Sequence, residues 1–136
     1  MQISSGAIIT DGKKILLGHT TRSTFWSIPK GKVEEDENYW EACVREIREE
    51  TNINLHSLKT SVIYDLGEFN YLNDKKLYLF KIVVNDLPDV NKLKCNSITS
   101  RGFPEFDKFA YFEFDTAIKK MNKNLAKLFE KNNLLY

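Results

Sequence analysis

The sequence has few cysteines, almost no net charge and no long apolar run. Its two cysteines, Cys43 and Cys95, do not form a pair at metal-ligand spacing, so reduced, intracellular thiols are expected. A formal net charge of +1 gives no bulk electrostatic reason to expect a nucleic-acid or membrane partner. No charged stretch followed by an apolar run opens the chain, and no window is long enough to span a bilayer. These features predict a soluble, cytoplasmic protein without a membrane partner.

The length of the chain limits the number of domains. A chain of 136 residues is long enough for one domain with a real core and too short for two ordinary ones. We therefore expect residues 1–136 to form a single domain, with an oligomeric state that the sequence leaves open. The two histidines, His19 and His56, stand alone in the sequence, and no catalytic dyad is expected from either.

The pattern of apolar and turn-forming residues predicts a mixed α/β layer structure. Asp11-Gly12 is a strong hairpin signal between two strand-like runs, and Gly67 suggests a bulge in a later strand. A long loop with at most one short strand is expected over residues 86–104. Asp115 is expected to cap a last helix over about residues 115–130. Strands are predicted at residues 3–10, 14–19, 25–28, 57–69, 76–84 and 109–114.

A second helix is predicted over about residues 38–51. Asn38 followed three residues later by Glu41 is a capping-box pattern. On the helical wheel, Trp40, Cys43, Val44 and Ile47 form an apolar face. The residues Glu46, Glu49 and Glu50 occupy another face at positions i, i+3 and i+4. The same helix therefore carries one face for a core and one face of carboxylates.

The three carboxylates repel one another, and the helix dipole opposes negative charge near the C-terminal end of a helix. That cost suggests a bound cation, and hard divalent cations such as Mg²⁺ take oxygen ligands. The alternative is a solvated, Glu-rich surface face, because such runs are common on exposed helices. Taken alone, residues 45–50 favour a solvated surface face. The fixed spacing of further residues before and after this run favours a bound cation.

The wider spacing is GKVEEDENYWEACVREIREETNI, from Gly31 to Ile53. It resembles the Nudix box, the signature of the Nudix hydrolases, which has Gly, five residues, Glu, seven residues and then Arg-Glu-aliphatic-x-Glu-Glu-x-Gly-aliphatic. The one departure is Asn52, where the family usually has Gly. Asn is the next best residue for a left-handed backbone after a helix, so we expect a small cost in stability and none in activity. The residues that match in register are Gly31, Glu37, Arg45, Glu46, Ile47, Glu49, Glu50 and Ile53.

The resemblance implies an α/β/α sandwich around a mixed sheet. It also implies Mg²⁺-dependent hydrolysis of a diphosphate linkage in a nucleoside diphosphate derivative, with Mn²⁺ as an alternative metal. Carried over residue by residue, it makes Glu49 and Glu50 metal ligands and Glu46 a ligand or the base that activates water. The carbonyl of Lys30 becomes a further ligand. The same resemblance gives structural roles to Gly31, which would let the loop turn tightly, and to Glu37 and Arg45.

Family members often take one more carboxylate from a loop before a late strand, and Glu105 lies in the corresponding place. The alternative is a surface Glu beside the turn-forming Pro104, and Asp107 and Glu113 are weaker candidates for the same role. Substrate phosphates would meet cations from the box entry and from the preceding loop. The substrate-binding candidates are Arg22, Lys30, Lys32 and, for base stacking, Tyr71.

The sequence leaves the substrate open. The entry Pro29-Lys30-Gly31 resembles the branches of the family that cleave polyphosphates, which favours a dinucleoside polyphosphate or a nucleoside triphosphate. The alternatives are the 5′ end of RNA and ADP-ribose or a nucleotide sugar. A catalytically silent nucleotide-binding module is a reading of a different class. The intact Glu46, Glu49 and Glu50 favour an enzyme, because degenerate members usually lose one of them.

Overall fold

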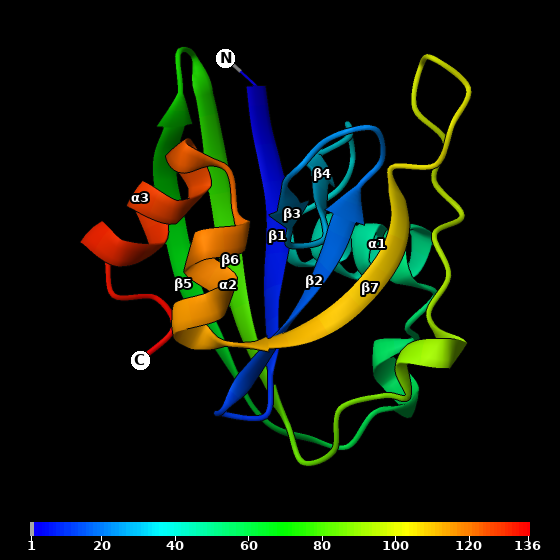
Figure 1. Cartoon of the computed structure of the whole chain (residues 1–136). Coiled ribbons are helices and arrows are strands. Elements are labelled where there is room, and N and C mark those ends of the chain that lie inside the picture. The colour runs from blue at the N-terminus through cyan, green and yellow to red at the C-terminus, as the bar shows by residue number, and fades with distance from the viewer. Residues whose placement is uncertain (1) are drawn as a thin grey trace.

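The computed structural model describes residues 2–136. Its strands form one mixed sheet (Figure 1), which confirms the predicted α/β class. Two short 3₁₀ turns lie in loops, at Leu55–Ser57 and Val90–Lys92. The strands are β1 Gln2–Thr10, β2 Lys14–Thr20, β3 Trp26–Ser27, β4 Lys30–Lys32, β5 Thr60–Leu72, β6 Lys75–Val84 and β7 Phe106–Glu113.

Strand β1 organises the sheet, whose order is β3-β2-β1-β6-β5. It runs parallel to β6 over its whole length, from Gln2 to Thr10. On its other side β1 changes partner: its C-terminal end pairs with β2, and residues 4–6 pair antiparallel with β4. Strand β7 pairs with β2. This change of partner brings β4 to the sheet beside the start of α1.

Helices cover both faces of the sheet. Helix α1, Tyr39–Thr51, packs on one face against alternate residues of the strands, among them Ala7, Ile9 and Leu16. Helices α2, Phe114–Lys120, and α3, Lys123–Lys131, pack on the other face (Figure 1). The period of two along a strand separates the two apolar cores in this way. Within residues 2–136 no helix is long and apolar enough to span a membrane.

Turn chemistry formed the predicted hairpin and bulge. The Asp11 carboxylate accepts hydrogen bonds of 2.9 Å from the backbone N–H groups of Lys13 and Lys14, and Gly12 has a φ of 96°. In β5 the pairing register shifts between Asp65 and Gly67, which is the predicted bulge, and Gly67 has a φ of 91°. Strand β3 is shorter than the strand predicted at residues 25–28. Strand β7 begins earlier than the strand predicted at residues 109–114.

The prediction of one C-terminal helix capped by Asp115 is wrong. The chain leaves the helix at Met121, and Asn122 begins α3 by accepting a 2.9 Å bond from the N–H of Leu125. Asp115 lies in the first turn of α2, and its carboxylate accepts a 2.8 Å bond from the hydroxyl of Tyr136. The apolar spacing continues across the break because both helices pack on the same sheet face, so the pattern concealed the second cap.

Both ends of α1 follow the local sequence. The side chain of Asn38 accepts a bond from the N–H of Glu41, and the Glu41 carboxylate accepts one from the N–H of Asn38, which completes the predicted capping box. At the other end, Asn52 has φ 67° and ψ 14°, the left-handed backbone expected there. Its N–H donates to the carbonyl of Arg48 at 2.9 Å. The departure from the box pattern therefore keeps the backbone that Gly would supply.

Two substitutions at Asn52 test this backbone argument. Asn52→Gly should be neutral or slightly stabilising, because Gly enters the left-handed region without steric strain. Asn52→Val should lower the free energy of unfolding by about 1 kcal/mol or more, because a β-branched residue tolerates that region poorly. Thermal melts of the two variants decide the matter. Equal stability of the Val variant and the native chain would contradict the argument.

Candidate functional site

Two carboxylates of α1 are buried against β4. Glu46 is 7% exposed and Glu50 is 4% exposed. The backbone N–H of Lys30 donates a 2.9 Å hydrogen bond to Oε1 of Glu50. In a helix, residues four apart lie on the same face, so both side chains reach the same strand. The carboxylate face predicted for the helix therefore points to β4, and two of its three members are withdrawn from solvent.

Gly31 lies in β4, and the expected tight loop at this position is absent. A Cβ atom there would overlap the carboxylate of Glu46. The glycine is needed for a close approach of backbone and side chain, and its φ is not in the left-handed region. The sequence marked the right residue but suggested the wrong physical reason, because the pairing of β4 with β1 is a tertiary contact.

Arg45 joins the two ends of the box. Its Nε donates to Oε2 of Glu37 at 2.7 Å, and its Nη2 donates to Oε1 of Glu37 at 2.9 Å. The same Nη2 donates to the carbonyl of Lys32 at 3.0 Å. Its Nη1 donates to Oε1 of Glu46 at 2.8 Å. The fork geometry of the guanidinium thus fixes the loop, the end of β4 and one buried carboxylate together.

Glu49 lies differently from its two neighbours. Its side chain is 44% exposed, and its Oε2 is 3.3 Å from Nη1 of Arg45. The expected common face is therefore divided into two buried carboxylates and one that is half exposed at the rim. Rotation of an exposed side chain needs little energy, so Glu49 remains within the candidate ligand set.

Burial and mutual repulsion shift the acid–base behaviour of the site. Burial raises the pKa of Glu50 well above its usual range, and the charges of Glu46 and Glu105 add to the shift. Burial also raises the pKa of Glu46 in spite of the opposing Arg45. By contrast, the hydrogen bonds from Arg45 lower the pKa of Glu37. The site thus holds acidic groups that would be stabilised in their charged form by an added cation.

Glu105 belongs to this electrostatic group although it is far away in the sequence. Its charge acts on both Glu46 and Glu50. Two backbone bonds fix its position: its N–H donates to the carbonyl of Ser97 at 3.0 Å, and its carbonyl accepts from the N–H of Thr21 at 3.1 Å. The alternative Glu113 lies at the far end of β7, opposite Lys14. The structure therefore brings the first candidate, and not Glu113, towards the helix.

His19 does not stand alone, which corrects the expectation from the sequence. Its Nδ1 is 2.7 Å from Oδ1 of Asp107, across the pairing of β2 with β7. Its ring also meets Trp26 edge to face, with centroids 5.2 Å apart. The two partners are 88 residues apart, so no local pattern could have indicated the pair. Asp107, the other weak alternative to Glu105, is therefore engaged by His19.

The substrate-binding candidates separate into two places. The Nζ of Lys30 lies 5.7 Å from the centroid of the Tyr71 ring, so two predicted binders meet. The guanidinium of Arg22 lies 4.5 Å from the centroid of the Phe103 ring and joins two loops. Lys32 is exposed at the end of β4.

The donor set is suited to a hard cation. Glu50 has one neutral N–H partner and makes no ion pair among the described residues, although it is almost fully buried. Carboxylate oxygens and a backbone carbonyl are the ligands that Mg²⁺ prefers. No three His, Cys, Asp or Glu side chains within residues 2–136 are already gathered as a metal cluster. The residues present fit the ion by their chemistry, with Glu49 as the member that would have to turn inward.

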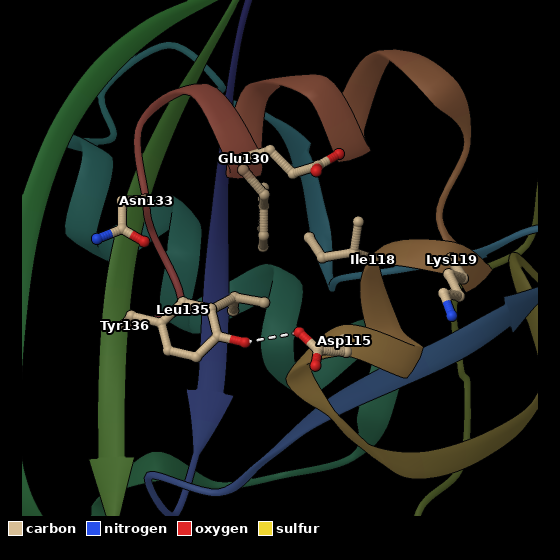
Figure 2. Close-up of a pocket in the computed structure, with 8 residues that line it drawn as sticks. Asp115, Ile118, Lys119, Glu130, Asn133, Leu135 and Tyr136 are labelled. Atoms are coloured by element: carbon tan, nitrogen blue, oxygen red, sulfur yellow. Dashed lines mark hydrogen bonds between the residues drawn. The ribbon is translucent and has the colours of Figure 1, made fainter.

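A pocket of about 450 Å³ lies elsewhere, between α2, α3 and the last residues of the chain. Figure 2 shows Asp115, Ile118, Glu130 and Tyr136 around it. Its lining includes none of the box residues, so it is not the candidate site.

Comparison with protein families finds a NUDIX domain over residues 1–131. Among curated proteins, mRNA-decapping enzyme subunit 2 of Saccharomyces cerevisiae is 32% identical over 129 residues, which are 90% of this chain. An m7GpppN-mRNA hydrolase of the same species matches equally. The chain spans 12% of the length of these curated relatives.

Solved structures share the fold. An Ap4A hydrolase of C. elegans, in a binary complex, superposes with a TM-score of 0.69 and 24% identity, covering 99% of this chain and 93% of that one. A MutT protein from Methanosarcina mazei has a TM-score of 0.64 and 22% identity, covering 98% and 93%. These similarities confirm the predicted sandwich. At sequence identities of 24% and 22% they show the fold alone.

Gly31→Ala tests whether the close approach to Glu46 matters for activity. The added methyl group should displace the Glu46 carboxylate, the flexible end of a side chain, and lower the rate of diphosphate hydrolysis at least tenfold, or about 1.4 kcal/mol of barrier. The cost in folding stability should stay near 1 kcal/mol. Gly12→Ala is the control: it strains a left-handed turn with open space around it, and should lose stability without losing rate. Rates and melts that fall together in both variants would contradict the argument.

Proposed function

The chain belongs to the Nudix family of pyrophosphohydrolases, and on that premise we propose that it hydrolyses a diphosphate linkage in a nucleotide with an extended phosphate chain, using Mg²⁺. Mn²⁺ is the alternative ion. One observation carries the proposal: Glu46 and Glu50 are buried beside β4, held by Arg45 and the Lys30 N–H. Burying two carboxylates is costly without a compensating cation.

The proposed ligands are Glu46, Glu49, Glu50 and the carbonyl of Lys30. When bound, Mg²⁺ supplies positive charge for the phosphate oxygens and for the charge that develops on the leaving phosphate. Arg45 orients Glu46 through its 2.8 Å bond, and Glu37 holds Arg45 in turn. The box residues outside the ligand set therefore act by positioning.

The proposed reaction is attack of water on phosphorus. The water oxygen forms the new P–O bond, the bridging P–O bond breaks, and the leaving phosphate takes the electron pair. Glu46 or Glu105 accepts the proton of the water. A raised pKa brings Glu46 closer to the range in which a carboxylate is an effective base. The charges of both groups raise the pKa of Glu50, which supports their assignment to the same site.

Dinucleoside polyphosphates are the first substrate candidate. Lys30 presents its ammonium group at the Tyr71 ring, so one cation and one aromatic face lie together, and the backbone N–H of the same lysine bonds Glu50. Stacking of a base on an aromatic side chain contributes about 1–3 kcal/mol where it occurs. Lys32 and Arg22 add exposed positive charge for further phosphates. Nucleoside triphosphates share these contacts apart from the second nucleoside.

The 5′ end of RNA is the second candidate. The observation that favours it is the 32% identity to mRNA-decapping enzyme subunit 2, which extends over 90% of this chain. ADP-ribose and nucleotide sugars have no comparable support. A catalytically silent module is disfavoured by the complete carboxylate set Glu46, Glu49 and Glu50.

Glu50→Gln tests the ligand assignment. The variant keeps the shape of the side chain and the acceptor for the Lys30 N–H but removes a buried negative charge, so the fold should remain intact. Turnover should fall by roughly two or more orders of magnitude, a few kcal/mol of barrier. Glu130→Gln, an exposed carboxylate on α3, is the control and should be neutral. Near-normal turnover of the Glu50 variant at saturating Mg²⁺ would refute the assignment.

A substrate panel tests the proposed specificity. We expect kcat/KM with Mg²⁺ to be higher for diadenosine tetraphosphate than for ATP or ADP-ribose, with triphosphorylated RNA as the fourth member. Phosphate products analysed after hydrolysis in labelled-oxygen water identify the attacked phosphorus. A preference of tenfold or more for ADP-ribose, about 1.4 kcal/mol of transition-state discrimination, would rule out both candidates. No turnover of any member would refute the proposed function.

A further inference from the structure

A groove runs between the edge strand β5 and helix α3. It consists of two adjoining cavities of about 390 and 540 Å³, which share Asn70, Tyr71 and Asn124. Figure 1 shows α3 beside β5, on the face of the sheet that α2 also covers. We call this the β5–α3 groove; the lining residues that matter here are Tyr71, Lys75, Asn124, Lys127, Lys131 and Asn132.

The β5–α3 groove is basic although the whole chain is nearly neutral. Its cations Lys75, Lys127 and Lys131 are exposed and make no ion pair among the described residues. The one acidic residue of its lining, Glu68, is neutralised by Lys76 at 3.0 Å. Such a local excess of positive charge attracts a polyanion whatever the net charge of the protein.

The polar residues of the groove can form hydrogen bonds with a ligand as well as attract its negative charge. On α3, Asn124, Lys127 and Lys131 recur at spacings of three and four, so they form one stripe along the helix. Amide side chains both donate and accept hydrogen bonds, as base edges and ribose hydroxyls require. The groove thus alternates amides with cations.

The length of the groove exceeds one nucleotide. The α3 stripe from Asn124 to Asn132 spans about 12 Å at 1.5 Å per residue. The β5 side from Glu68 to Leu72 spans about 13 Å at 3.3 Å per residue. Stacked nucleotides advance by about 3.4 Å each. Several nucleotides of one strand fit this length, which is more than the second nucleoside of a dinucleotide needs.

Tyr71 connects the groove to the carboxylate site. Its ring lines both cavities and also meets the ammonium group of Lys30. The backbone of that same lysine holds Glu50. A strand lying in the groove would therefore have one end at Lys30, the residue whose backbone N–H bonds Glu50.

We propose that the β5–α3 groove binds single-stranded RNA, with the 5′ end of the strand directed past Tyr71 and Lys30 towards Glu46 and Glu50. The inference rests on the proposed function for the chemistry at that 5′ end. Lys127 and Lys131 contact phosphates, the asparagines contact bases and riboses, and Tyr71 stacks on the nucleotide that enters the site.

The test is binding of a fluorescent 12-nucleotide RNA with a 5′-hydroxyl end, followed by anisotropy at several salt concentrations. The double variant Lys127→Gln/Lys131→Gln should weaken binding roughly tenfold and flatten the slope of log affinity against log salt by about 1.4, or about 0.7 per lost phosphate contact. The charge-matched control is Lys119→Gln/Lys123→Gln, two exposed lysines outside the groove, which should change neither quantity.

Three results would overturn the inference: equal weakening by both double variants, no weakening by either, or duplex RNA of the same length binding as tightly as the single strand. Because the probe has no phosphoanhydride, its binding does not depend on hydrolysis. Turnover of the substrate panel without RNA binding would therefore refute this inference alone. RNA binding with no turnover of any panel member would refute the proposed function alone.

Discussion

The burial of two carboxylates between α1 and β4 is the constraint on which the rest of this site depends. An isolated buried carboxylate costs several kcal/mol, and here two of them share one place. Arg45 offsets the charge of Glu46 at 2.8 Å, and the Lys30 N–H satisfies Glu50 at 2.9 Å. The compensation is incomplete, because the pKa of both groups stays raised. An arrangement that is stable as a scaffold but short of positive charge is what a cation-dependent site requires.

The sheet makes that burial possible by dividing the pairing of β1. Its first half pairs with β4 and its last residue with β2, so β4 reaches α1 without belonging to a continuous ladder. Ser5 adds a link from β1 to the start of the helix, donating to the carbonyl of Tyr39 at 2.7 Å. Close approach then leaves no room for a side chain at position 31. The pairing of β4 with β1, the absence of a Cβ at Gly31 and the burial of Glu46 therefore depend on one another.

Lys30 connects this arrangement to the opposite side of the sheet. Its N–H donates a hydrogen bond to Glu50, and its ammonium group lies at Tyr71, which lines the β5–α3 groove. A residue in a strand separates backbone and side chain in this way, because the backbone bonds within the sheet while the side chain projects from one face. The backbone and the side chain of one residue therefore contact a carboxylate of α1 and an aromatic ring of β5.

Much of this was determined by the sequence itself. The capping box at Asn38, the left-handed Asn52, the turn at Asp11-Gly12 and the bulge at Gly67 depend on contacts within a few residues, and a local pattern carries that information. Other features were decided by tertiary structure. The break between α2 and α3 at Met121, which forms a bridge with Trp26, needs segments far apart to meet. So do the pairing of His19 with Asp107 and the close approach of Gly31 to Glu46. Their free energy comes from packing and charge across the sheet, which no spacing in the chain records.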